Sequence, residues 1–240
     1  MMKMKMVLIL IFFLIILILS YSKMNTKEIN YTILGDKELF SNNIISKNFS
    51  DLIYDELNKE KTFGFYSKDF IKSDIRIVDV INCIEENDKV EDVTIQNILK
   101  RSSILLIGIG NNEINYKLSK IDEKENNEKN VYNYLDEVFN DFVDLINIIK
   151  NYSDSNLFVL GYYNDTNNKN NDKYYNYINQ KIEIFCKKNK IEFLNLFEIL
   201  NNNEDYLTKT NPVYITSEGN LSLFNKIYRK INKLYLHKDY

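Results

Sequence analysis

The residues that could do chemistry lie in three short stretches, each beside an apolar run or a predicted helix. They are Gly35-Asp36-Lys37, Gly110-Asn111-Asn112-Glu113 and the segment from Asn211 to Gly219, which includes Tyr214. Carboxylates, amines and phenols can move protons or hold charge, and amides can donate hydrogen bonds to a developing oxyanion. These stretches could therefore serve catalysis or the binding of a ligand.

Alternating strands and helices must position these stretches. Apolar runs predict strands at 29–34, 62–66, 104–109, 157–160 and 191–196. Amphipathic spacing predicts helices at 49–57, 75–84, 93–99, 131–149, 174–188 and 221–236. The charged or Asn-rich segments 120–130 and 162–173 are predicted loops. This alternation predicts an α/β fold with a central parallel sheet of about five strands covered by helices on both faces. Functional groups of such sheets lie at the carboxyl ends of the strands.

The composition excludes several kinds of site. The 240-residue chain has one histidine, His237, so a metal site built from several imidazoles is impossible within it. Its two cysteines cannot form a zinc ribbon or a disulfide scaffold, and we expect no metal and no cofactor. A net charge of -3 argues against a nucleic-acid partner, because nucleic-acid binders usually carry a strong basic excess.

The first 22 residues are typical of an export signal. Lys3 and Lys5 precede an apolar run at 6–19, and small residues follow at Ser20 and Ser22. We expect a signal peptide or N-terminal membrane anchor at 1–22, a linker at 23–28 and one domain at 29–240. Because basic residues stay on the cytoplasmic side, the domain would be extracytoplasmic, either secreted or tethered to the cell membrane. The absence of Ala and the abundance of Asn, Lys and Ile suggest an AT-rich bacterial genome.

Cys83 and Cys186 both fall in predicted helices. In an oxidising compartment they could pair, or they could remain buried thiols.

Four blocks of the sequence, in this order and at this spacing, resemble the SGNH/GDSL hydrolase family. They are Ile33-Leu34-Gly35-Asp36-Lys37, Ile107 to Glu113, Phe158 to Asn164, and Asn211 to Asn220. The resemblance covers about 30–236. It implies a flavodoxin-like three-layer α/β/α sandwich and a pocket for an acyl or glycan ligand.

The family's reaction is acyl transfer, in which a serine attacks, a histidine takes its proton and an aspartate orients the histidine. In this chain the corresponding positions hold Lys37, Tyr214 and Asn211. The glycine of the family's second block falls near Ser73 or Asp74. The retained residues are the oxyanion-hole Asn112 and the turn-forming Gly35, Asp36, Gly110 and Gly219. The resemblance thus implies a binding set of Gly35, Asp36, Lys37, Gly110, Asn112 and Tyr214.

These replacements predict that the module binds or scaffolds at the cell envelope without catalysis. A lysine amine is protonated at neutral pH, and a tyrosine is a poor base there. Lys37 could hold an anion or act as a desolvated nucleophile, or it could fill the pocket beside Asp36. Asn112 could remain an oxyanion donor, or it could tie the first and third loops together.

Two other functions stay open. One is an active esterase, lipase or deacylase with a non-standard site, using Ser41 or Ser73 as nucleophile. The other is a structural partner of another envelope protein. His237 offers no simple base, because it follows the last predicted helix whereas the family's base precedes it.

Overall fold

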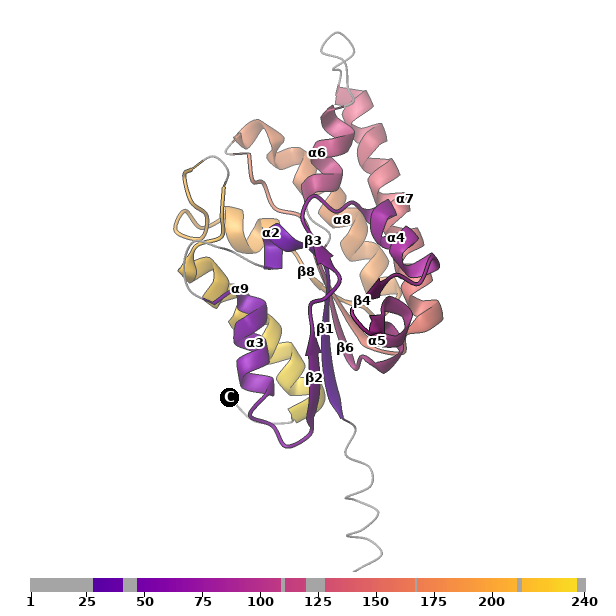
Figure 1. The fold of residues 1–240 in the computed structure, drawn as a ribbon. Helices are drawn as coiled ribbons and strands as arrows, with labels where there is room; N and C mark the ends of the chain where they lie inside the picture. The colour runs from indigo at the N-terminus through magenta and orange to yellow at the C-terminus, as the bar shows by residue number, and fades with distance from the viewer. Residues whose placement is uncertain are drawn as a thin grey trace, which may run out of the picture.

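A parallel sheet forms the centre of the computed structural model, which describes residues 28–40, 47–108, 111–119, 128–166, 168–210 and 213–236. The order of its strands is β2-β1-β6-β7-β8 (Figure 1). Their bounds are β1 (Ile29–Asp36), β2 (Phe63–Ser67), β6 (Ile104–Gly108), β7 (Asn156–Leu160) and β8 (Glu192–Leu194). A two-residue strand, β3 (Ile71–Lys72), pairs with the end of β1. This flavodoxin-like order confirms the predicted fold class.

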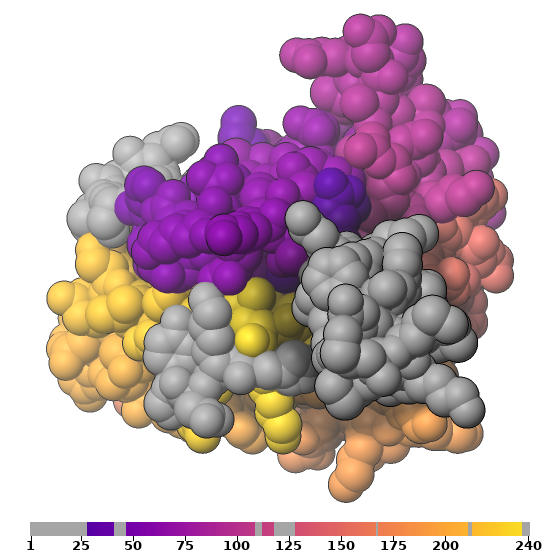
Figure 2. All heavy atoms as spheres, turned by 90° about the horizontal axis from the view of Figure 1, so that it is seen from below, coloured from indigo at the N-terminus to yellow at the C-terminus, as the bar shows by residue number. Residues whose placement is uncertain are grey.

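Helices cover both faces of this sheet (Figure 1). One face carries α3 (Phe49–Leu57) and α9 (Ser217–Ile231), which pack against each other. Figure 2 shows the end at which the strands begin, with the purple α3 region beside the yellow C-terminal residues. The helices of the other face are α4 (Ile77–Glu85), α5 (Ile95–Arg101), α6 (Asn111–Ser119), α7 (Glu128–Tyr152) and α8 (Asp172–Lys188).

Alternation along the strands explains the two cores. In β6, Leu105 and Ile107 join the core beneath α4, α7 and α8, whereas Ile104 and Leu106 join the core beneath α3 and α9. Successive side chains of a strand point to opposite faces, so a continuous apolar run suits a strand that is buried on both sides.

Several predicted boundaries were wrong. Residues 93–94 were expected in a helix, but they form β5 (Val93–Thr94), which pairs antiparallel with β4 (Lys89–Val90). The last helix begins at Ser217 because the Thr216 hydroxyl caps it by accepting from the Gly219 amide at 3.1 Å. It ends at Ile231 and continues as the π-helix η3 (Asn232–Leu236).

Helix occurs in several segments outside the predicted helices. The stretch at 35–37 runs into α2 (Lys37–Phe40), and the stretch at 110–113 runs into α6. The segment 162–173 contains the 3-10 turn η1 (Lys169–Asn171) and the start of α8. Of the segment 120–130, residues 120–127 lie outside the described residues and 128–130 begin α7. A π-helix, η2 (Phe197–Asn201), follows β8 and was not predicted.

Cys83 and Cys186 are buried free thiols on α4 and α8, so they do not form the disulfide left open above. Burial raises the pKa of Cys186 to about 12. The targeting segment, Ser41, Gly110, Asn211 and His237 lie outside the described residues. Within the ranges that are described, no helix is both long and apolar enough to cross a bilayer.

Truncation of the fully buried Phe158 on β7 should destabilise the domain by about 3–5 kcal/mol in Phe158→Ala, because it removes a large apolar side chain and leaves a cavity. Ile184→Ala provides the control, since 70% of Ile184 is exposed, and it should change stability by less than about 0.5 kcal/mol. Urea unfolding followed by circular dichroism measures both. Equal losses in the two variants would contradict the assigned core.

Candidate functional site

The end of β1 delivers Asp36 to the carboxyl edge of the sheet. Gly35 pairs with Ile71 of β3 on one side and with Gly108 of β6 on the other. Its φ of 132° is readily adopted only by glycine, which explains the residue at this position. The chain then turns into α2, so Asp36 is 4% exposed whereas Lys37 and Glu38 reach solvent.

Asp36 is held from two directions. One carboxyl oxygen accepts from the side-chain amide of Asn112 at 2.9 Å, and the other accepts from the backbone amide of Glu38 at 3.0 Å. The bond to Asn112 ties the first loop to the start of α6, as one of the two interpretations of Asn112 expected. The bond from the Glu38 amide forms an Asx-turn, in which an aspartate side chain accepts from the backbone amide two residues later.

Asp36 and Glu38 share a proton. Burial, together with the hydrogen bond to Glu38 and its charge, raises the pKa of Asp36 to about 8. Burial also acts to raise the pKa of Glu38, but hydrogen bonds from Asp36 and the Ser73 hydroxyl outweigh it and lower that pKa. At neutral pH the buried member of the pair therefore keeps its proton and the outer member carries the charge.

The turn after β3 completes this cluster. Glu38 accepts hydrogen bonds from the Ser73 hydroxyl and from the backbone amide of Asp74. Asp74 has a φ of 54°, a left-handed conformation that suits glycine better than other residues. This agrees with placing the family's second-block glycine near Ser73 or Asp74.

Two tyrosines, Tyr163 and Tyr214, differ in their relation to this cluster. Tyr163 follows β7, and its pKa is raised by burial and then by the charges of Asp165, Asp36 and Glu38, which places its ring near the carboxyl pair. Tyr214 is held elsewhere, because its backbone amide donates to the Thr208 hydroxyl at 2.9 Å and its carbonyl accepts from the Thr208 amide at 2.8 Å. The structure thus joins Asp36 and Asn112 directly, and it records no bond between Tyr214 and the described members of this cluster.

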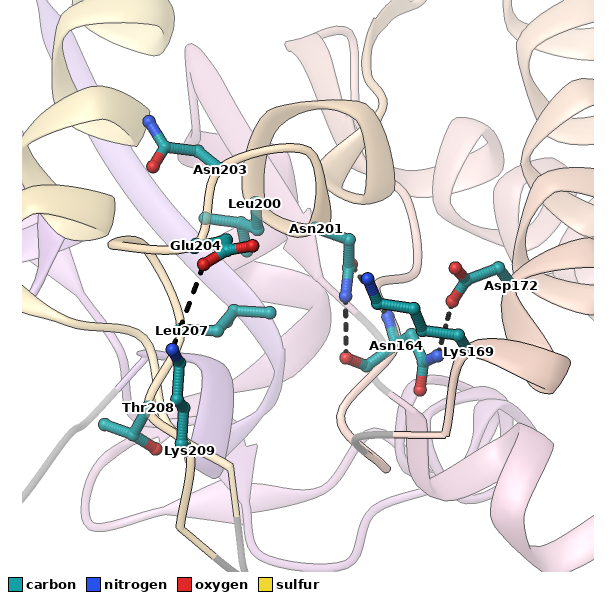
Figure 3. A pocket seen from close by; sticks show the side chains of 10 residues that line it. All are labelled: Asn164, Lys169, Asp172, Leu200, Asn201, Asn203, Glu204, Leu207, Thr208 and Lys209. Atoms are coloured by element: carbon teal, nitrogen blue, oxygen red, sulfur yellow. Dashed lines mark hydrogen bonds and ion pairs between the residues drawn. The ribbon is translucent and has the colours of Figure 1, made fainter.

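A pocket of about 450 Å³ opens at the carboxyl ends of β7 and β8 (Figure 3). Asn164, Lys169 and Asp172 line one side, and Glu204, Leu207 and Lys209 line the other. The remaining lining residues are Leu200, Asn201, Asn203 and Thr208. Eight of these ten residues carry an amide, carboxylate, amine or hydroxyl group, so the pocket can exchange hydrogen bonds with a hydroxyl-rich ligand.

Asn164 organises this pocket. It is 4% exposed, and it exchanges two hydrogen bonds with Asn201, at 3.0 Å and 2.9 Å. Its side-chain amide also donates to Asp172 at 2.6 Å. The predicted loop at 162–173 gave no sign of this role, because the partner Asn201 lies 37 residues away in the sequence.

Sequence reasoning missed Glu38, Asn164 and Asn201. Glu38 had a local signal, since a carboxylate two residues after a buried aspartate can share its proton, whereas the two asparagines had none. No group of three or more His, Cys, Asp or Glu side chains suited to holding a metal ion occurs among the described residues.

Comparison with known proteins identifies the fold. No family model matches the sequence, and no curated protein sequence matches it. A lipase from a goat rumen metagenome superposes with a TM-score of 0.66 at 17% identity, over 84% of this chain and 96% of the lipase. A member of the lipolytic G-D-S-L family from Veillonella parvula gives 0.60 at 12% identity, over 84% and 97%.

A catalytic mutant of an acetylxylan esterase from Geobacillus stearothermophilus gives a TM-score of 0.59 at 16% identity, over 85% of this chain and 94% of the esterase. The chain has the fold of the SGNH/GDSL lipolytic enzymes. At these identities the likeness establishes the fold alone.

Asp36 should make stability depend on pH. Its folded pKa of about 8 lies above the ordinary value of 3.8, so its full contribution is present below about pH 3.8 and is lost as pH rises to about 8. The steepest slope is about 1.4 kcal/mol per pH unit. The lowered pKa of Glu38 affects the free energy of unfolding in the opposite direction. Its stabilising contribution is lost only as pH falls below the ordinary value of 4.5.

Asp36→Asn should remove the slope between pH 5 and pH 8, because an amide of the same size has no proton to lose in this range, although it can keep only one of the two bonds that Asp36 accepts. Urea unfolding at pH 5, 6, 7 and 8 measures it. Asp92→Asn, which changes an exposed carboxylate, should leave the slope in place. An unchanged slope in Asp36→Asn would show that Asp36 ionises normally.

Proposed function

We propose that this protein is an exported, membrane-tethered binding module with an SGNH/GDSL-hydrolase-like fold that no longer hydrolyses esters. The observation that carries the proposal is the bond from the Asn112 amide to Asp36 at 2.9 Å. Asn112 occupies the position of the family's oxyanion donor, and here it holds an internal carboxyl group.

The residues around Asp36 support the same conclusion. The position of the nucleophile holds Lys37 instead of a serine, and the position of the base holds Tyr214 instead of a histidine. These positions therefore lack the hydroxyl and the imidazole that acyl transfer uses. The Asp36–Glu38 pair also brings a negative charge close to the site, and that charge would oppose a developing oxyanion.

The pocket favours a glycan over an acyl chain as the ligand. Of its ten lining residues, only Leu200 and Leu207 are aliphatic, whereas an acyl chain needs a mainly apolar wall. The structurally similar esterase acts on acetylxylan, which is also a glycan. An envelope protein partner remains a further possibility for the tethered form.

One contact favours the alternative of an active hydrolase. The Ser73 hydroxyl donates to the Glu38 carboxylate, as a serine activated by a base would. The lowered pKa of Glu38 makes it a weak base at pH 7, however, so proton transfer from serine would be inefficient.

Purified protein should hydrolyse p-nitrophenyl acetate no faster than buffer does, because Lys37 and Tyr214 stand where the family's serine and histidine would be. Activity that Lys37→Ala or Ser73→Ala abolishes would overturn the proposal and would identify the nucleophile. A triple variant with Lys37→Ser, Asn211→Asp and Tyr214→His tests the lost triad, and activity gained only there would establish these positions as the family's.

Binding of a glycan should depend on the pocket. Lys169→Met should weaken binding roughly fivefold, the loss of about one hydrogen bond. The probes are acetylated xylo-oligosaccharides and N-acetylglucosamine oligomers, measured by calorimetry. Lys188→Met, at the other end of α8, should leave affinity unchanged. Equal weakening in both variants, or no binding of either probe, would contradict a glycan site in this pocket.

A further inference from the structure

A basic groove lies beside the edge strand β8, along the last part of α9. Lys226, Arg229 and Lys230 of α9 and Lys233 of η3 line an open groove of about 510 Å³ beside β8. Their spacing of three, four and seven residues places them along one side of the helix. The other lining residues are Phe193, Leu194, Asn195, Glu198 and Ile199.

Little negative charge balances this groove. Lys230 pairs with Glu192 of β8, and Glu198 is the one acidic residue among the described lining residues. The remaining cations, Lys226, Arg229 and Lys233, are exposed. The groove is therefore strongly positive in a chain whose formal net charge is -3.

Stabilisation of the helix dipole explains only part of the cluster. Cations favour the last turn of a helix, which accounts for Arg229 and Lys230. Lys226 lies before that turn and Lys233 lies beyond α9. The dipole of α9 therefore leaves Lys226 and Lys233 unexplained.

The groove also adjoins the point where the N-terminal segment joins the domain. The Tyr235 hydroxyl, two residues after Lys233, donates to the carbonyl of Ser103. The Ser103 hydroxyl in turn donates to the carbonyl of Glu28 at 2.9 Å. Figure 1 shows the lower end of α9 near the start of β1. Tyr235 thus lies two hydrogen bonds from Glu28, the last residue of the linker.

We infer that the groove of Lys226, Arg229, Lys230 and Lys233 docks the domain onto the anionic headgroups of the membrane that anchors it. The inference rests on the tethering proposed above. A linker of residues 23–28 reaches about 20 Å when fully extended, so an anchor at 1–22 would keep this end of the domain close to the bilayer. A basic surface held there attracts anionic lipid.

The test uses the full chain reconstituted in nanodiscs of phosphatidylcholine alone or with phosphatidylglycerol. Labelling of lysines by an amine-reactive reagent, read by mass spectrometry, reports how exposed each one is. In anionic discs Lys226 and Lys233 should label several-fold more slowly than in neutral discs, and high salt should restore the rate by screening. Lys169, at the carboxyl edge, should label equally in both.

A double variant, Arg229→Gln with Lys230→Gln, should raise labelling of Lys226 and Lys233 in anionic discs, because each lost cation weakens attraction roughly fivefold. Lys117→Gln with Lys173→Gln removes two cations that pair with Glu137 and Glu128 away from the groove, and it should change nothing there. Equal labelling in neutral and anionic discs, or equal effects of the two double variants, would overturn the docking surface.

Failure of the tether gives a different result. If the full chain does not enter either kind of disc, the anchor is wrong. Sedimentation of the same chain with phosphatidylglycerol vesicles then decides the groove by itself. Salt-sensitive binding that the groove variant loses and the control variant keeps would support it, and no binding would overturn it.

Discussion

Burial of the central strands on both faces is the constraint on which the rest of this structure depends. β1 and β6 contribute apolar side chains alternately to two cores, which leaves little room for polar groups within the sheet. An unpaired polar group there would cost free energy, so charge and hydrogen-bonding capacity concentrate at the two ends of the strands. The carboxyl end holds Asp36 and its partners.

At the carboxyl end the polar groups satisfy one another. Asp36 is bound by Asn112 and Glu38, and Glu38 is bound by Ser73 and Asp74. Such a closed network stabilises the loops that it links, but it leaves few groups aimed at a reacting substrate. In a hydrolase the same positions would hold groups that stay unsatisfied until the transition state forms. This closed network is the basis of our proposal that the domain binds a ligand and does not hydrolyse it.

The proposed tether fits one arrangement at a cell surface. A domain joined to an N-terminal anchor has its amino end nearest the bilayer, and in a parallel sheet that end is the one remote from the ligand-binding loops. In the docking that we propose, the positive charge beside β8 would add to the hold of the anchor.

The sequence by itself determined the order of the strands and helices, because apolar periodicity is a local property. Runs such as 104–109 and the amphipathic segment at 49–57 placed β6 and α3 with little error. The topology of a parallel sheet then predicted that Asp36 and Asn112 would lie near each other. Only the tertiary structure decided what they do together. The proton shared by Asp36 and Glu38 depends on burial, and the Asn164–Asn201 pair joins residues 37 apart. Neither burial nor long-range contact is written in local spacing, so the sequence could predict the place of the site but not its chemistry.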